Sequence, residues 1–240
     1  MKPVLVLDCG SRTIAELIDA LHAEEVEVVV RSVPMQGTGI PLDARFPLLE
    51  TRDLVDVNPL GIVISGSPHY LYTANGRVPP ADFFPAVVEQ DIPILGICGG
   101  HELLAHLIAR YHARAQEKVP RVVGANPSGQ HEPISQRENP VTFNWYVDRP
   151  EALDEGEHLF GGLPARFPAW LYHVHQVRTL PPRCTSLGGT METIHGAISY
   201  TPPGSNTPFA FGVQFHPEIS PSSTRHVIFS NFIRSCARRS

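Results

Sequence analysis

The chain has 240 residues, of which 42% are hydrophobic and 18% charged, and its formal net charge is −5. These values are typical of a globular protein, and basic residues cluster only near the end of the chain, so we expect no nucleic-acid partner. The apolar runs are too short for a signal peptide or a membrane span, so we expect no membrane association.

The first half of the chain alternates predicted strands with predicted helices. Apolar or β-branched runs predict buried strands at residues 4–7, 26–30, 61–64 and 92–97. Apolar residues at helical spacing predict helices that begin near Ile14, Phe83 and Leu103. Residues 32–59 are rich in proline and glycine and show only weak periodicity. This alternation is typical of an α/β fold with an open, doubly wound, mostly parallel sheet flanked by helices.

The second half has a different pattern. Residues 121–140 are polar and irregular, whereas residues 170–177, 193–200 and 210–215 predict strands separated by proline and glycine loops. Residues 225–236 predict a closing helix. We expect these strands to add a small antiparallel extension to the sheet.

A cysteine stands in a sharp turn between a predicted strand and a predicted helix. Residues 96–100 read GICGG, the pattern of a nucleophile elbow, in which small neighbours permit a strained backbone. The helix that follows directs its positive end toward the Cys98 sulfur, which favours the thiolate. The alternative is an inert core cysteine. The glycines after Cys98 argue against it, because a helix interior disfavours them.

Residues 211–218 read FGVQFHPE and supply a histidine and an acid. Pro217 drives His216 into extended backbone, and in an extended chain His216 and Glu218 project to the same side. A carboxylate beside an imidazole fixes its tautomer and stabilises its charged form. With Cys98 the two residues would form a nucleophile triad, if the fold joins the segments. A surface His-Pro-Glu turn is the alternative.

These motifs resemble those of the class I glutamine amidotransferases of the triad type, and most closely the glutaminase part of GMP synthases. Residues 4–11 resemble the opening strand of that family, residues 61–68 its oxyanion strand and loop, and residues 96–100 its nucleophile turn. Residues 170–181 resemble its substrate-binding strand, and residues 212–218 its His-Glu segment. The resemblance spans most of the chain and implies a flavodoxin-like fold.

The resemblance also implies a site made of three groups of residues. The catalytic triad would be Cys98, His216 and Glu218. The backbone N–H groups that hold the oxyanion would come from Gly66, Ser67 and Gly99. The substrate-binding residues would be Glu102, Tyr172, Val174 and His175.

Four positions depart from the family motif. Glu102 stands where glutamine is usual, and a carboxylate there attracts an ammonium group and repels an α-carboxylate. Gly99 replaces a bulkier residue, so we expect a wider pocket. Ser67 replaces a glycine but keeps its backbone N–H, and Tyr172 stands where a small polar residue is usual.

Further side chains are expected to be structural. Cys9, Cys184 and Cys236 form no C-x-x-C pair, so we expect neither a disulfide framework nor a zinc knuckle. Scattered free cysteines are typical of a reducing compartment, so we expect a cytoplasmic location. His173 and His175 form an H-x-H pair without a further cluster in sequence reach, so we expect no metal. No nucleotide-binding motif is present, and we expect no cofactor. The scattered prolines mark no linker, so residues 1–240 are expected to form a single domain.

The motifs favour an enzyme that releases ammonia from the side-chain amide of glutamine through a γ-glutamyl thioester. We expect it to act as an amidotransferase subunit that feeds a separate synthetase. Glu102 and Gly99 support a second hypothesis, a stand-alone hydrolase of a γ-glutamyl amide or peptide. A non-catalytic binding relative is the third hypothesis, and the presence of Cys98, His216 and Glu218 argues against it.

Overall fold

The computed structural model describes residues 2–35, 44–70, 76–113, 118–126, 141–145 and 159–239. The strands in this part of the chain are β1 (Val4–Asp8), β2 (Val28–Ser32), β3 (Gly61–Ile64), β4 (Ile94–Ile97), β5 (Val123–Ala125), β6 (Val141–Trp145), β7 (Arg166–Ala169), β8 (His175–Val177), β9 (Cys184–Gly189), β10 (Ala197–Tyr200) and β11 (Ala210–Val213). The helices are α1 (Ile14–His22), α2 (Asp53–Asp56), α3 (Phe83–Glu89), α4 (Gly99–His112) and α5 (Ser222–Ala237), with a 3₁₀ helix at Pro217–Ile219.

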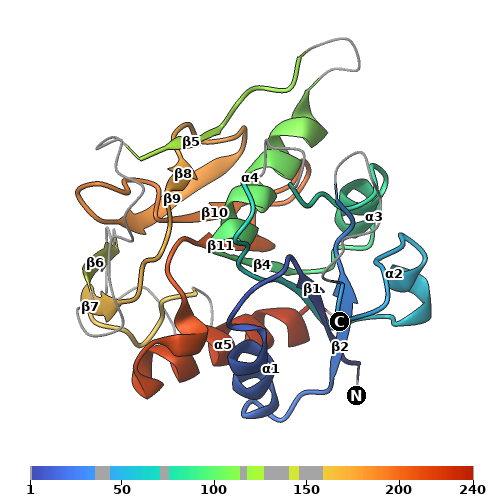
Figure 1. The fold of residues 1–240 in the computed structure, drawn as a ribbon, viewed down its shortest axis with the longest axis horizontal. Coiled ribbons are helices and arrows are strands. Elements are labelled where there is room, and N and C mark those ends of the chain that lie inside the picture. The colour runs from blue at the N-terminus through green and yellow to red at the C-terminus, as the bar shows by residue number, and fades with distance from the viewer. Residues whose placement is uncertain are drawn as a thin grey trace.

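The main sheet has nine strands in the order β2-β1-β3-β4-β11-β10-β9-β6-β7 (Figure 1). Strands β2, β1, β3, β4 and β11 are parallel, and their order is that of a flavodoxin-like doubly wound sheet. Strands β10, β9, β6 and β7 continue the sheet in antiparallel pairs. Strands β5 and β8 pair separately. The predicted fold class, a mostly parallel sheet with an antiparallel extension, is confirmed.

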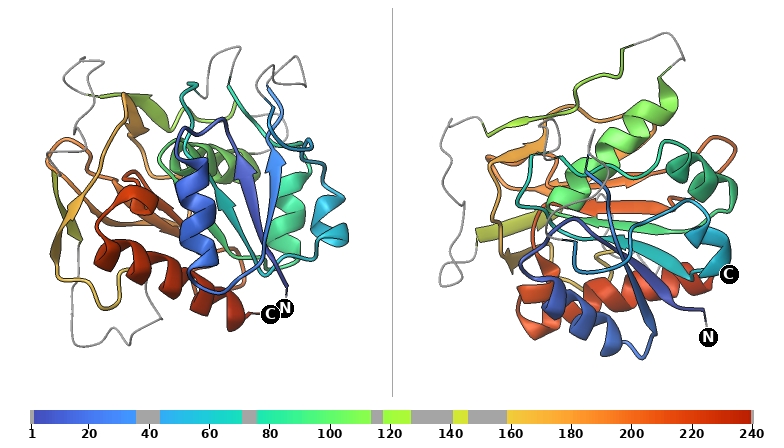
Figure 2. Two further views of the ribbon diagram at one scale, coloured as in Figure 1. Left: turned by 60° about the horizontal axis from the view of Figure 1, so that its bottom comes forward. Right: turned by 45° about the vertical axis from the view of Figure 1, so that its right-hand side comes forward.

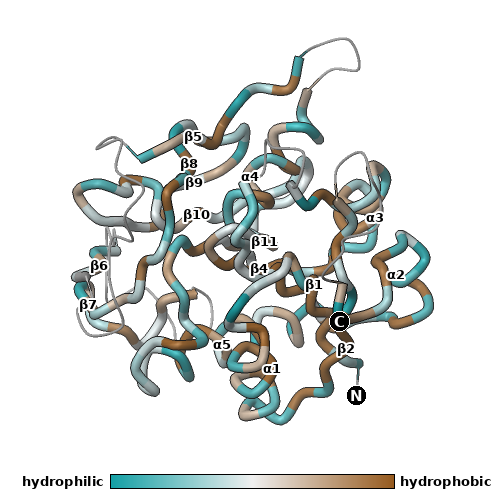
Figure 3. Tube along the Cα trace, viewed as in Figure 1, coloured by the Kyte–Doolittle hydropathy of each residue, from teal (hydrophilic) through white to brown (hydrophobic). Residues whose placement is uncertain are grey.

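Helices cover both faces of the parallel strands, as the two rotated views show (Figure 2). In β1, Val4 and Val6 pack on one face with α1 and α5, while Leu5 and Leu7 pack on the other face with α3 and α4. All four side chains are buried. Strands buried on both faces read as continuous apolar runs, which is why the sequence predicted them well. The hydropathy colouring shows the same apolar centre (Figure 3).

The second half contains more strands than the sequence predicted. Strands β5, β6, β7 and β9 were not predicted. The predicted strand at 170–177 is a strand only at His175–Val177, and residues 170–174 form a loop beside the nucleophile. Helix α2 was also missed in the irregular segment 32–59. Among the described helices, none has both the length and the apolar character needed to cross a bilayer.

An aromatic cluster supports the antiparallel strands. The rings of Phe143, Phe160 and Phe167 each contact Phe215, with centroid distances of 5.0 to 6.4 Å. All four side chains are buried. Because Phe215 directly precedes His216, this packing helps to fix the chain that carries the predicted catalytic histidine.

Candidate active site

The nucleophile elbow predicted at residues 96–100 is present in the backbone. Strand β4 ends at Ile97, Cys98 adopts φ 51° and ψ −109°, and α4 begins at Gly99. A positive φ is uncommon for a residue with a side chain, so the surrounding packing must impose it. At Gly100, an added Cβ would collide with the backbone of Ile64. The turn therefore presents Cys98 at the positive end of the α4 dipole.

The pairing of β4 with β11 brings the nucleophile to the histidine segment. Ile97 lies opposite Val213 in this parallel pair. One position later, the backbone N–H of Cys98 donates to the carbonyl of Val213 at 2.8 Å. The chain that leaves β11 therefore passes the elbow, and Cys98 and His216 line the same cavity.

His216 and Glu218 form a hydrogen-bonded pair, with Nδ1 and Oε1 2.7 Å apart. The backbone of His216 is extended, as the following proline predicted, with φ −100° and ψ 90°. The predicted reason for the contact is wrong, because Pro217–Ile219 form a 3₁₀ helix and Glu218 returns to the imidazole through a turn. The backbone N–H of His216 donates to the carbonyl of Trp170, and the Ser220 hydroxyl donates to the His216 carbonyl.

The charges around His216 favour the protonated form of its ring. Burial lowers the pKa of His216, but negative charge on Cys98 and Glu218, together with hydrogen bonds to both, raises it. The net result is a pKa well above 6.5. An imidazolium beside the sulfur is the charged partner that a thiolate nucleophile needs.

A hydroxyl group from the loop after β1 completes the support of Glu218. The hydroxyl of Thr13 donates to Oε1 of Glu218 at 2.7 Å, and the Ser11 and Thr13 hydroxyls lie 3.0 Å apart. Thr13 occupies the N-cap position of α1 yet makes no capping hydrogen bond with its side chain. A residue type that usually caps a helix therefore serves the acid of the predicted triad instead.

The loop that carries Thr13 is itself held in place. Arg45 Nη2 donates to both carboxylate oxygens of Asp8, at 3.1 and 3.3 Å, and to the carbonyl of Ser11 at 2.8 Å. The carboxylate of Asp8 also accepts the backbone N–H groups of Gly10 and Ser11. Asp8 is buried, so this network is a fixed part of the site.

The two loops predicted to hold the oxyanion touch each other. A Cβ on Gly99 would lie 2.7 Å from the backbone nitrogen of Ser67 and 2.8 Å from its Cβ. Ser67 therefore fills the space that a side chain at position 99 would need. The expectation that Gly99 widens the pocket is wrong, because the two positions exchange volume. A Cβ on Gly66 would lie 3.0 Å from the His216 ring, so Gly66 also lies beside the nucleophile.

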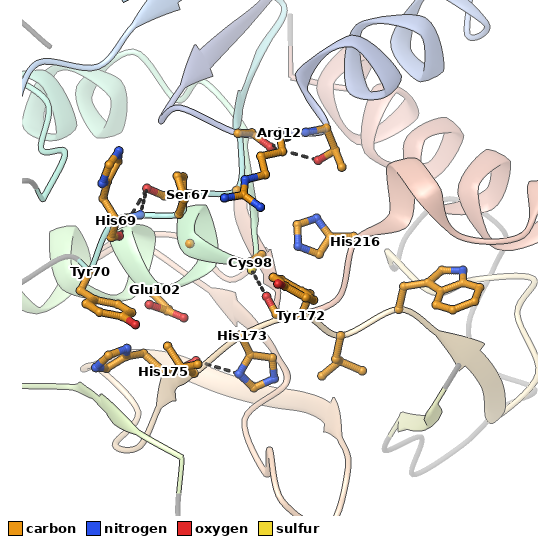
Figure 4. Close-up of a pocket in the computed structure, with 18 of the residues that line it drawn as sticks. Arg12, Ser67, His69, Tyr70, Cys98, Glu102, Tyr172, His173, His175 and His216 are labelled. Atoms are coloured by element: carbon orange, nitrogen blue, oxygen red, sulfur yellow. Dashed lines mark hydrogen bonds between the residues drawn. The ribbon is translucent and has the colours of Figure 1, made fainter. Parts of the chain in front are cut away.

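The predicted site residues surround one cavity of about 580 Å³ (Figure 4). Its walls include Cys98, Gly66, Ser67, Gly99, Glu102, Tyr172, Val174, His175 and His216. Glu218 lies behind His216 and is buried. A cavity of this size lies in the range that holds a complete small-molecule ligand.

Glu102 is a buried acid in the wall of the cavity. It is 7% exposed, and Nε2 of Gln214 donates to its Oε1 at 3.0 Å. Burial raises the pKa of Glu102 to about 7, and the hydrogen bond from Gln214 lowers it by a smaller amount. The same Gln214 nitrogen lies 4.0 Å from the sulfur of Cys98. At neutral pH the carboxyl group is therefore divided between its charged and neutral forms.

The predicted substrate-binding residues of the 172–175 segment present different groups to the cavity. The Tyr172 carbonyl accepts the Cys98 thiol at 3.6 Å, while the Tyr172 side chain is 59% exposed. The carbonyl of Val174 accepts the backbone N–H of Asn126. The ring of His175 packs against Tyr70, with centroids 4.4 Å apart. Residues 172–174 form a loop and only His175 begins β8, so the predicted strand is absent beside Cys98.

Among the residues expected to be structural, His173, Cys9 and Cys236 are buried and Cys184 is half-buried. His173 hydrogen-bonds to the carbonyl of His175 and to Thr193, and burial lowers its pKa to about 4. Burial raises the pKa of Cys9 to about 12 and that of Cys184 to about 12. All four cysteines are free. Within the described part of the chain, no group of three or more His, Cys, Asp or Glu side chains is placed to hold a metal ion.

Three residues at the site were not identified from the sequence: Arg12, Thr13 and Gln214. Arg12 and Thr13 line the cavity from the loop after β1. Ligands of doubly wound sheets bind beyond the carboxyl ends of the strands, so the position of this loop was a usable signal. No sequence pattern indicated the contact of Gln214 with Glu102, because it depends on how the chain after β11 packs against α4.

The family model described as Glutamine amidotransferase class-I matches residues 5–236. The chain belongs to this family. Among curated proteins it is similar to the GMP synthase [glutamine-hydrolyzing] of Thermomicrobium roseum, 28% identical over 232 residues that cover 96% of this chain and 34% of that protein. The protein of the same name from Streptococcus pyogenes is 29% identical over 240 residues, covering 100% of this chain and 37% of that protein. The chain thus spans about a third of the length of these relatives.

Solved structures with the same fold include a putative GMP synthase subunit from Thermoplasma acidophilum. It has a TM-score of 0.65 and 20% identity, with 99% of this chain and 95% of that chain covered. A glutamine amidotransferase from Thermotoga maritima has a TM-score of 0.55 and 15% identity, with 100% and 98% covered. The fold of the class I glutamine amidotransferases is therefore confirmed for this chain.

We predict that Thr13→Val lowers kcat for an amide substrate about tenfold, because Glu218 loses a hydrogen bond of the charged type. Thr13→Ser keeps the hydroxyl and serves as the matched control. KM should stay unchanged, since Thr13 acts through Glu218 and His216. Steady-state ammonia release measures both parameters. A valine variant as active as the serine variant would show that this contact is only structural.

Glu102→Gln should stabilise the protein at pH 8 but not at pH 4. The folded state raises the pKa of Glu102 from 4.5 to about 7, so it binds a proton more tightly than the unfolded state does. Stability due to this group is therefore full below pH 4.5 and is lost as the pH rises toward 7. The shift corresponds to roughly 3 kcal/mol at pH 8. Urea unfolding of both proteins at the two pH values measures it, and an equal difference at both pH values would contradict the prediction.

Proposed function

We propose that the protein is a cysteine amidohydrolase that releases ammonia from the side-chain amide of glutamine. The observation that carries the proposal is the strained Cys98 turn beside the His216–Glu218 pair in a single cavity. Membership of the class I glutamine amidotransferase family supports the same chemistry. The three residues act as nucleophile, acid-base catalyst and orienting acid.

The reaction proceeds in two halves. The thiolate of Cys98 attacks the amide carbon, and the C–N bond breaks as the imidazolium of His216 gives its proton to the departing nitrogen. This leaves ammonia and a γ-glutamyl thioester. His216, now neutral, takes a proton from water, which attacks the thioester carbon and releases glutamate and the thiolate. The backbone N–H groups of the Gly66–Ser67 loop and of Gly99 stabilise the oxyanion of both steps, at about 3 kcal/mol per donor.

The ammonia is proposed to pass to a separate synthetase. The relatives are named GMP synthase [glutamine-hydrolyzing], and this chain matches about a third of their length. The remaining two thirds of those relatives have no counterpart in this chain, so a synthetase would have to be supplied separately. We therefore expect low glutaminase activity of the isolated chain and an increase when the cognate synthetase is added.

Glu102 favours a second candidate function, the stand-alone hydrolysis of another γ-glutamyl amide. A buried carboxyl group in the cavity wall is attracted to an ammonium group and repels a carboxylate. It lies next to Gln214, which approaches the nucleophile. A substrate that places its ammonium near Glu102 and its carboxylate elsewhere would be favoured. Such an enzyme would be active without a partner.

Cys98→Ala should abolish ammonia release from glutamine and from every other amide in a panel of side-chain amides, because it removes the attacking atom. Loss of the nucleophile of a triad typically lowers kcat by about 10⁴-fold or more. Circular dichroism and the unfolding midpoint show whether the variant is folded. A folded alanine variant with wild-type activity would remove Cys98 from the mechanism.

Glu102→Gln should shift the order of preference within the same panel toward glutamine. The neutral side chain no longer repels an α-carboxylate, so kcat/KM for glutamine should rise about tenfold relative to amides that lack an α-carboxylate. Values of kcat/KM for both enzymes across the panel provide the test. An unchanged ranking would show that Glu102 does not select the substrate.

A further inference from the structure

Arg12 extends into the catalytic cavity with its charge unpaired. The side chain is exposed, lines the cavity and points into it in the close-up view (Figure 4). No described residue forms a hydrogen bond or an ion pair with its guanidinium group. In contrast, the guanidinium of the nearby Arg45 donates to the Asp8 carboxylate and to the Ser11 carbonyl. Arg12 is therefore a cation available to a ligand.

Arg12 enters the cavity on the same side as His216 in the close-up view (Figure 4). Its neighbour Thr13 donates to Glu218, and Glu218 accepts from His216. In the proposed mechanism His216 delivers the proton to the departing nitrogen. The guanidinium thus enters the cavity from the loop that supports this acid, whereas Glu102 belongs to α4 and bonds to Gln214.

The backbone on both sides of Arg12 is fixed, so the side chain starts from a defined point at the edge of the cavity. The carbonyl of Ser11 accepts Arg45 Nη2, the backbone N–H of Thr13 bonds to the Ser11 hydroxyl, and Thr13 is tied to Glu218. A guanidinium binds carboxylates strongly and with defined geometry, since both groups are planar and can form two parallel hydrogen bonds.

We propose that Arg12 forms an anion subsite for a carboxylate carried by the departing amine. This inference rests on the cysteine chemistry of the proposed function and, among its two candidate substrate classes, on the second, which it narrows to γ-glutamyl amides of amino acids. The cavity of about 580 Å³ has room for such a ligand. Its charges complement a substrate with an α-ammonium near Glu102 and a carboxylate near Arg12.

The hydrolysis of such a γ-glutamyl amide follows the same steps as the hydrolysis of glutamine, with an amino acid leaving in place of ammonia. The Cys98 sulfur bonds to the γ-carbonyl carbon as the C–N bond breaks, and the amino acid leaves with the proton from His216. Water then cleaves the thioester and gives glutamate. The whole reaction consumes one water and needs no further reactant.

The test compares γ-glutamylglycine with γ-glutamylglycinamide, which differ only in the terminal carboxylate. Wild-type enzyme should prefer the carboxylate form about tenfold in kcat/KM, the size expected of one charge-assisted hydrogen-bonded contact. Arg12→Gln should remove the preference, and Arg12→Lys should keep part of it. Arg234→Gln, which removes an exposed arginine of α5 outside the cavity, is the matched control and should keep it fully.

Binding of the two compounds to Cys98→Ala, measured by calorimetry, tests the subsite independently of turnover. The carboxylate form should bind about tenfold more tightly, and the added Arg12→Gln change should equalise the two. Equal binding of both compounds to Cys98→Ala, or a preference that survives Arg12→Gln, would overturn the subsite. Glutamine hydrolysis that depends on Cys98, together with equal binding, would overturn the subsite and leave the proposed function standing. Selective binding of the carboxylate form without hydrolysis of any amide would overturn the proposed function and leave the subsite standing.

Discussion

The parallel pairing of β4 with β11 is the constraint on which the site depends. These two strands are far apart in the chain, and their register places Ile97 opposite Val213, one residue before Cys98 and Gln214. Because side chains alternate along a strand, a slip of one residue would exchange the faces of Gln214 and Phe215. Gln214 would then leave Glu102, and Phe215 would leave the aromatic cluster. The hydrophobic packing of β11 thus determines the geometry of the polar site.

Burial and charge tune the two titratable groups of the cavity by different routes. Burial without a cationic partner raises the pKa of Glu102 to about 7. Burial acts in the opposite direction on His216, and the charges of Cys98 and Glu218 overcome it. The site therefore combines an imidazole whose protonated form is favoured with a carboxyl group whose pKa lies near neutral pH. Environments that separate the roles of neighbouring groups in this way are typical of catalytic sites.

The sequence predicted the parallel half of the fold, and it failed where structure depends on distant contacts. Strands β1, β3 and β4 are buried on both faces and form continuous apolar runs. The alternating exposed and buried residues of β7, a strand that contains a proline, carry a weaker signal. The contact between His216 and Glu218 was predicted for the wrong local reason. The bond from Thr13 to Glu218 joins positions 205 residues apart and leaves no local pattern.

The departures from the family motif fall into two physical kinds. At position 99 the missing side chain leaves no open space, since the backbone nitrogen and Cβ of Ser67 lie where a Cβ would need room. The two loops therefore approach closely, and the backbone N–H groups that the proposed chemistry needs are kept. Glu102 instead adds a titratable carboxyl group to the cavity wall, which Arg12 also lines. Shape at the reacting atoms determines which bond breaks, whereas charge at a distance determines which molecule is held there. In the proposed function, Glu102 and Arg12 would therefore affect which substrate is held, and Cys98 would determine which bond breaks.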